Sequence, residues 1–125
     1  MALGTATPVT FILTADREQA KAFYGGVLGL TQTGEDEYAT SYDLNGTPLR
    51  LTSVADHKPE PHTVLGWNVP DIAATAAELK SRGVVFEIYE GFGQDADGIW
   101  HAPDRNVKIA WFLDPEGNNL SITQF

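Results

Sequence analysis

The sequence has no cysteine, and basic residues are scarce beside acidic ones. Without cysteine the chain forms no disulfides or thiolate metal sites and has no thiol nucleophile. Its 8 Lys and Arg against 17 Asp and Glu leave a net charge of −9. A surface of this sign repels a phosphate backbone, so nucleic acid is not an expected partner. It attracts cationic small molecules, although its plainer role is solubility.

Long apolar runs are missing as well. No stretch approaches the roughly 18 uninterrupted apolar residues of a membrane span, and the first residues lack the basic region and apolar core of a secretory signal. We therefore expect no membrane partner and a cytoplasmic location. A length of 125 residues with 42% hydrophobic and 20% charged content is typical of one globular domain.

The first half of the chain reads as a strand, a helix and further strands. The β-branched and aromatic run VTFILTAD (9–16) predicts a strand. Asp16 is placed to cap the following helix, and Gln19 completes a capping-box pattern. The helix carries apolar residues at helical spacing and ends near Gly29. Two more strands are predicted at 38–44 and 47–54, with a tight turn at Asn45-Gly46 between them.

The second half repeats this plan. A strand at 64–71 ends at Asp71, which caps a helix that Gly83 terminates. Three more strands are predicted, at 84–90, 107–114 and 118–125. The predicted fold class is therefore α+β, with two βαβββ modules whose curved mixed sheets enclose a cup. The predicted boundaries within a single domain, 1–125, are about 7–56 for module one, 57–62 for the linker and 63–125 for module two.

Alternation along the strands assigns side chains to faces. Leu49 and Leu51 are expected to face the helix, so Arg50 and Thr52 point the other way. In the last strand Leu120 and Ile122 share the helix side, and the polar residues Asn119, Ser121 and Thr123 share the opposite side with Phe125. A cup lined by such partly polar faces is a usual place for an organic small molecule.

Two segments carry a family resemblance. AKAFYGGVLGL after a strand that ends in Asp, and WFLDPEGNNLSITQF at the C-terminus, resemble the vicinal oxygen chelate superfamily. That group includes glyoxalase I, the bleomycin- and fosfomycin-resistance proteins and the extradiol dioxygenases. The resemblance covers residues 7–125 and implies a fold of paired modules, often paired across chains, so a homodimer is expected. Because the chemistry of the superfamily varies widely, the resemblance does not settle the activity.

The resemblance also implies where a metal would bind. Metal-dependent members place ligands at the start of the first strand and in the last strand of a module, which correspond here to Val9, Val64, Arg50 and Ser121. Valine has no donor atom, and a guanidinium repels a cation. We therefore expect no metal and no other cofactor.

Arg50 has two readings. In the first, its guanidinium forks onto a carboxylate, phosphate or enolate oxygen of a ligand. In the second, it pairs with an acidic neighbour such as Asp43 or extends to the rim.

Further candidates line the same cup. Trp111 occupies a position that contributes a side chain to the cup in relatives; the alternative is that it packs in the core. Trp100 and His101 lie in a Gly-rich loop. Either this loop acts as a lid over the cup, or Trp100 only anchors the loop to the rest of the domain. His101 would be suited to general-base chemistry if it reached the cup. No catalytic residue is assigned. The predicted ligand-binding residues are Val9, Phe11, Arg50, Thr52, Val64, Asn68, Trp100, His101, Trp111, Ser121 and Thr123.

The leading functional hypothesis is metal-independent binding of an antibiotic or metabolite in the cup, as in drug-sequestering resistance proteins. The alternative is a metal-independent isomerase, cyclase or lyase in which Arg50 stabilises an oxyanion. A glyoxalase- or dioxygenase-type metalloenzyme with displaced ligands is the third possibility. The sequence leaves open whether the protein is an enzyme.

Overall fold

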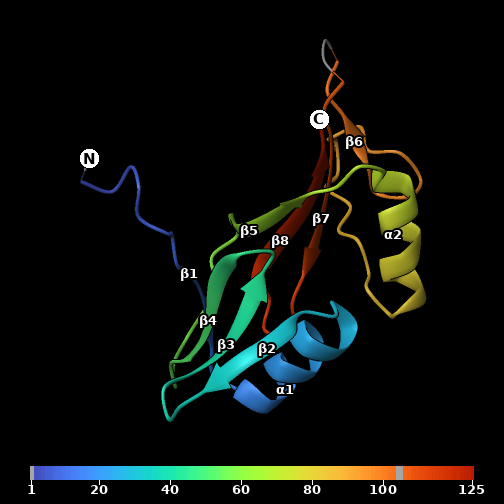
Figure 1. Ribbon diagram of the computed structural model, residues 1–125. Helices are drawn as coiled ribbons and strands as arrows, with labels where there is room; N and C mark the ends of the chain where they lie inside the picture. The colour runs from blue at the N-terminus through green and yellow to red at the C-terminus, as the bar shows by residue number, and fades with distance from the viewer. Residues whose placement is uncertain (1, 104–105) are drawn as a thin grey trace. The chain divides into compact units, whose positions relative to one another are not determined.

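The computed structural model describes residues 2–103 and 106–125, which form two compact units, Met1–Lys58 and Pro59–Phe125. Each unit contains one four-stranded mixed sheet with its own helix along one face (Figure 1). This arrangement confirms the predicted α+β class with two βαβββ-like modules. No helix within the described residues has the length and apolar character needed to cross a membrane.

The first unit orders its strands β1-β4-β3-β2. β1 runs parallel to β4, and the other two pairings are antiparallel. Its elements are β1 Thr10–Thr14, α1 Arg17–Lys21, the π-helix η1 Ala22–Val27, β2 Thr31–Glu35, β3 Ala39–Leu44 and β4 Thr47–Ser53. The core lies between the helix and the sheet, because Tyr24, Tyr42, Leu49 and Leu51 are all buried. Predicted Leu49 and Leu51 are therefore confirmed as core residues.

The second unit has the equivalent order β5-β8-β7-β6, again with one parallel pair, β5 and β8. Its elements are β5 Thr63–Asn68, α2 Ile72–Ser81, β6 Trp100–His101, β7 Lys108–Leu113 and β8 Asn119–Gln124. Leu120 and Ile122 are buried, as the alternation predicts, and the Phe112 ring stacks on Trp67 with centroids 6.5 Å apart. Trp67 is thus a packing residue.

The local signals for helix starts and turns are confirmed. The Asp16 and Asp71 carboxylates accept hydrogen bonds from the backbone N–H groups of Gln19 and Ala74, at 3.2 and 3.1 Å. These bonds satisfy N–H groups that a helix start leaves without an intrahelical partner. Gly46 adopts φ +103°, as its tight turn requires.

One predicted strand is wrong. Residues 84–90 form only an isolated bridge, from Phe86 to Phe112. The Gln94 side chain explains the difference: its amide accepts from the Tyr89 N–H at 2.7 Å and donates to the Glu87 carbonyl at 2.9 Å. A side chain therefore satisfies backbone groups that a neighbouring strand would otherwise pair. The strand that pairs with β7 at Ile109 is instead the two-residue strand β6.

Two features of the first unit differ from the sequence prediction. The βαβββ pattern requires a strand such as β2, but the sequence does not predict its range, because TQTGE is entirely exposed and lacks an apolar alternation. Pairing with β3, with a bulge at Gln32/Gly34, forms this strand. The predicted single helix changes to a π-helix at Ala22, where Leu28 N–H reaches the Phe23 carbonyl at 2.8 Å. The glycine pair Gly25-Gly26 lies inside this wider turn.

Where strands β5 and β8 pair, the Ser121 hydroxyl occupies the space that a side chain at Gly66 would need. A Cβ added at Gly66 would lie 2.6 Å from Ser121 Oγ, well inside van der Waals contact. We expect Gly66→Ala to destabilise the protein by about 1–3 kcal/mol, the usual cost of overpacking. Urea unfolding followed by circular dichroism measures the change.

The matched control is Gly34→Ala, where an added Cβ meets nothing within 4 Å. Adding Ser121→Ala to Gly66→Ala removes the clashing oxygen and is expected to restore most of the lost stability. An undiminished loss in the double variant would contradict the contact as its cause.

Candidate functional site

The face of the second sheet that points away from α2, its helix-free face, combines small polar and large aromatic side chains. Ser121 and Asn119 on β8 stand opposite Trp111 and Leu113 of β7 in the register. Thr123 and Asn68 are register partners at the other end of β8. Strand alternation thus brings together the predicted residues Asn68, Trp111, Ser121 and Thr123.

Four aromatic rings make up what we call the aromatic cluster of this face. Tyr89 and Phe92 each meet Trp111 edge to face, with centroids 5.7 and 5.6 Å apart. Phe92 also lies 5.7 Å from Trp100. Tyr89 and Phe92 are 38% and 47% exposed, so the cluster offers ring surface to a ligand.

Tyr89 is held in place from β8 and β5. Its hydroxyl accepts a 2.9 Å hydrogen bond from the Asn119 amide, and the Asn119 carbonyl oxygen accepts from the Thr63 hydroxyl at 3.0 Å. Asn119 is buried, so these bonds satisfy both ends of an amide removed from water. The tyrosine is therefore a preorganised part of the face.

A hollow of about 310 Å³ adjoins the cluster at Tyr89. It is lined by Pro59–Pro61, Glu87, Tyr89, Leu113, Gly117 and Asn119. We call it the 59–61 hollow. The Glu87 N–H donates to the Trp111 carbonyl at 2.8 Å, and Phe86 points into the core, so Glu87 stands on the helix-free face.

In the first unit Arg50 lies on the helix-free face of its sheet, beside Phe11 and Ser41 in the register. Its two Nη atoms each lie 3.3 Å from Asp36 Oδ2, and Nη1 also donates to Ser41 Oγ at 3.3 Å. Backbone N–H groups of Tyr38 and Ala39, with Arg50 as a smaller cause, hold the pKa of Asp36 below its ordinary value.

The acidic partner of Arg50 is thus Asp36, and the suggested partner Asp43 is wrong. Asp43 is engaged by the turn, where its carboxylate accepts from the Gly46 N–H at 2.8 Å. About a third of the Arg50 side chain remains exposed (34%). Its guanidinium therefore has an internal partner and still offers donors to solvent.

Apolar side chains flank Arg50. Phe11 is 59% exposed, and Val9, just before β1, is also exposed. Thr52 is half-buried, and its hydroxyl donates to the Arg50 carbonyl. The predicted group Val9, Phe11, Arg50 and Thr52 therefore shares one sheet face in this unit.

His101 lies apart from the aromatic cluster. It alternates with Trp100 along β6, so the two side chains leave the strand in opposite directions. Its Nε2 lies 3.0 Å from Asp95 Oδ2. Partial burial raises the pKa of Asp95, but the hydrogen bonds from His101 and from backbone N–H groups prevail and lower it. The histidine thus has an acidic partner outside the cluster.

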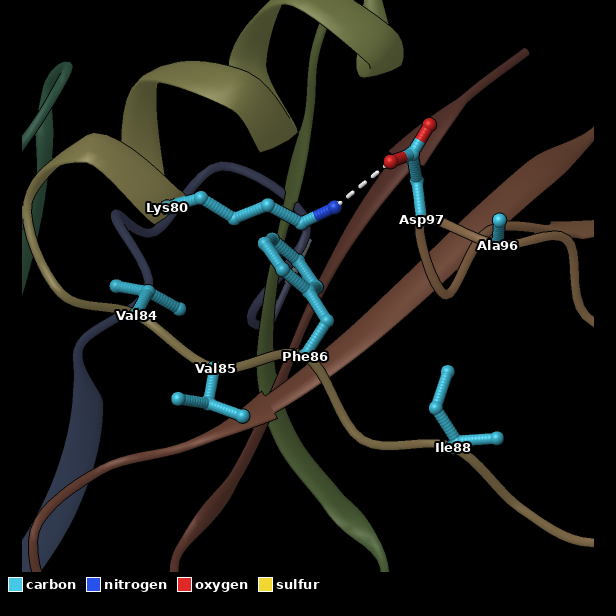
Figure 2. A pocket seen from close by; sticks show the side chains of 7 residues that line it. All are labelled: Lys80, Val84, Val85, Phe86, Ile88, Ala96 and Asp97. Atoms are coloured by element: carbon cyan, nitrogen blue, oxygen red, sulfur yellow. Dashed lines mark hydrogen bonds and ion pairs between the residues drawn. The ribbon is translucent and has the colours of Figure 1, made fainter.

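A second hollow, of about 280 Å³, lies between α2 and the segment that follows it. Figure 2 shows Lys80 reaching over Phe86 toward Asp97. The ammonium lies 3.0 Å from the Asp97 carboxylate and 5.7 Å from the ring centroid. The Lys80 ammonium and the Asp97 carboxylate are thus already paired with each other. The other lining residues of this hollow are mainly apolar, and Val85 and Ile88 are exposed.

The positions at which metal-dependent relatives place ligands do not fit a metal ion. Val9 and Val64 supply no donor atom, and the Arg50 guanidinium is bonded to Asp36. Ser121 supplies a single hydroxyl, packed against Gly66. Across residues 2–103 and 106–125, no three His, Asp or Glu side chains form a group suited to hold a metal.

Three residues of the helix-free face of the second sheet are not predicted from the sequence. The sequence pattern predicts a strand at Tyr89 and a loop at Phe92, and it indicates Val64 in place of Thr63. The bulge between Thr63 and Leu65 sets Thr63, rather than Val64, opposite Asn119. The aromatic content of 86–92 was a usable signal, but its pairing partner was not visible in the sequence.

Comparison with known proteins identifies the fold family. A sequence model of the Glyoxalase/Bleomycin resistance protein/Dioxygenase superfamily matches residues 6–122. No curated protein sequence matches the chain.

Among solved structures, SMU.1112c is 18% identical with a TM-score of 0.78, covering 96% of this chain and 98% of its own. A glyoxalase family protein from Enterococcus faecalis is 18% identical with a TM-score of 0.75, covering 98% and 99%. TnmS3, an antibiotic binding protein from Streptomyces sp. CB03234, is 22% identical with a TM-score of 0.67, covering 96% and 97%. At these identities the structures show a shared fold. Because the superfamily model matches residues 6–122 and the fold agrees with it, the chain belongs to the Glyoxalase/Bleomycin resistance protein/Dioxygenase superfamily.

Proposed function

We propose that this protein binds an organic small molecule, an antibiotic or a metabolite, against the aromatic cluster of the second unit, without a metal. The observation that carries the proposal is the mutual contact of Tyr89, Phe92 and Trp111, which Trp100 extends through its contact with Phe92. Partly exposed rings held at fixed angles provide a large contact area at little entropic cost. The structural neighbour TnmS3 is itself an antibiotic binding protein.

The polar side chains beside the cluster position Tyr89 for a ligand. Asn119 presents Tyr89 through a 2.9 Å hydrogen bond, and Thr63 fixes the Asn119 amide. Ser121 stands opposite Trp111 on the neighbouring strand. Such a mixture of apolar surface and a few placed polar groups is usual for small-molecule sites. A homodimer and a cytoplasmic location remain predictions.

An enzymatic role is the second candidate. The observation that favours it is the partly exposed Arg50 guanidinium beside the apolar Phe11. A metal-independent isomerase, cyclase or lyase would use such a group to stabilise an oxyanion. In that case the ion pair with Asp36 would hold the guanidinium in position.

The first prediction concerns the aromatic cluster. A thermal-shift screen of antibiotics and aromatic metabolites is expected to yield compounds that raise the melting temperature, because a ligand of the native state stabilises it. Trp111→Ala is expected to weaken the best compound by about tenfold or more, as loss of a central aromatic contact does. Tryptophan fluorescence titration measures the affinity. Tyr38→Ala, which removes an exposed ring from the first unit, is the control and should leave affinity unchanged.

The second prediction concerns metal. Dialysis against EDTA is expected to leave the affinity for that compound unchanged, because the four family ligand positions carry no suitable donor set. The same fluorescence titration measures the affinity, and elemental analysis of the purified protein measures its metal content. Zinc, nickel, manganese or iron retained at one equivalent after dialysis, together with binding lost on EDTA treatment, would contradict the proposal.

The third prediction separates the binder from the enzyme. If the protein is a binder whose ligand sits on the cluster, mass spectrometry recovers the compound unchanged after prolonged incubation, and Arg50→Ala leaves its affinity within about twofold. Conversion of the compound that Arg50→Ala abolishes and Arg50→Lys does not restore would establish the enzymatic role. Asp36→Asn tests the supporting ion pair in the same assay.

A further inference from the structure

The 59–61 hollow has a one-sided charge. Two carboxylate residues, Glu60 and Glu87, line it, and no lysine, arginine or histidine is among its described lining residues. Within residues 2–103 and 106–125, neither glutamate side chain forms an ion pair. The hollow between α2 and the following segment differs, because there the Lys80 ammonium already neutralises Asp97.

The remainder of the 59–61 hollow is apolar or aromatic. Pro59, Pro61 and Leu113, which is 38% exposed, also line it. Tyr89 belongs to both the hollow and the aromatic cluster, and Asn119 holds it by its hydroxyl. An aromatic face attracts a cation that approaches it, and more strongly where water is partly excluded.

Carboxylates beside an aromatic ring and hydrocarbon walls are complementary to an alkylated nitrogen cation. The carboxylates offset the charge, the ring adds a cation–π contact, and the hydrocarbon walls accept the N-alkyl groups. An anion would meet two like charges, and a neutral group would gain no charge attraction from the carboxylates. The net charge of the chain, −9, favours the approach of a cation in addition.

We propose that the 59–61 hollow binds the positively charged nitrogen of an organic amine or quaternary ammonium ligand, whose aromatic part lies on the aromatic cluster. This inference rests on the proposed function and names the ligand class of the same face. Glu60 and Glu87 are its charge-recognising residues, and Tyr89 joins the cation site to the aromatic site.

Three probes that share a phenyl group test the charge preference: benzyltrimethylammonium, benzyl alcohol and phenylacetate. Titration of the intact protein, followed by tryptophan fluorescence and by NMR, is expected to give the tightest binding for the cation and the weakest for the anion. The double variant Glu60→Gln/Glu87→Gln is expected to weaken the cation by about five- to tenfold, on the scale of two partly exposed ion pairs, and to leave benzyl alcohol within about twofold.

The matched control is Glu90→Gln, which removes the same charge from the same segment outside the hollow. It should change the affinity for the cation by less than twofold. Added salt should weaken the binding of the cation but not the binding of the other two probes. Equal affinities for all three probes, or an equal effect of Glu90→Gln, would overturn the charge preference and leave the aromatic site standing. Absence of binding by every probe would overturn both proposals together.

Discussion

The pairing of residues 86 and 87 with β7 is the contact on which the candidate site depends. The bridge from Phe86 to Phe112 and the 2.8 Å hydrogen bond from Glu87 N–H to the Trp111 carbonyl set the register of this segment. Because side chains alternate along extended backbone, this register sends Phe86 into the core and Glu87 and Tyr89 to the helix-free face. A shift by one residue would exchange the two sets.

The Gln94 amide prevents the segment that follows Phe86 from pairing as an ordinary strand. By bonding the backbone of Glu87 and Tyr89, as well as the Gly98 carbonyl at 2.7 Å, it ties the loop back on itself. Phe92 is thereby returned to the face that carries Trp111 and Trp100. The loop is therefore an ordered part of the candidate site, held by hydrogen bonds from a side chain to the backbone in place of a strand ladder.

The two units use the same topology for different chemistry. In the first unit the helix-free face carries a guanidinium that is bonded to Asp36 and flanked by exposed apolar residues. In the second unit the corresponding face carries aromatic rings, and the carboxylates of Glu60 and Glu87 border the hollow beside them. Small differences at equivalent strand positions, Arg50 against Ser121, thus change which ligand groups each face suits.

Much of the fold follows from short-range signals in the sequence. The caps at Asp16 and Asp71, the Asn45-Gly46 turn and the alternation of Leu49, Arg50 and Leu51 each depend on neighbours within a few residues, so they were predictable. That alternation also identified the polar row of the last strand. The repeat of the strand and helix pattern in the second half indicated the order of the modules, and the family resemblance agreed with it.

The members of the site that the sequence left out depend on contacts between distant residues. The Gln94 bonds, the β5 bulge that selects Thr63, the hydrogen bond from Asn119 to Tyr89 across 30 positions, and the choice of Asp36 over Asp43 for Arg50 all have this character. For each of these contacts the sequence offers several chemically suitable partners, and the packing of the sheet determines which partner is used. The residue types and faces were therefore set locally by the sequence, whereas the grouping of those residues into a site was set by tertiary pairing, because only that pairing places distant donors and rings within contact distance.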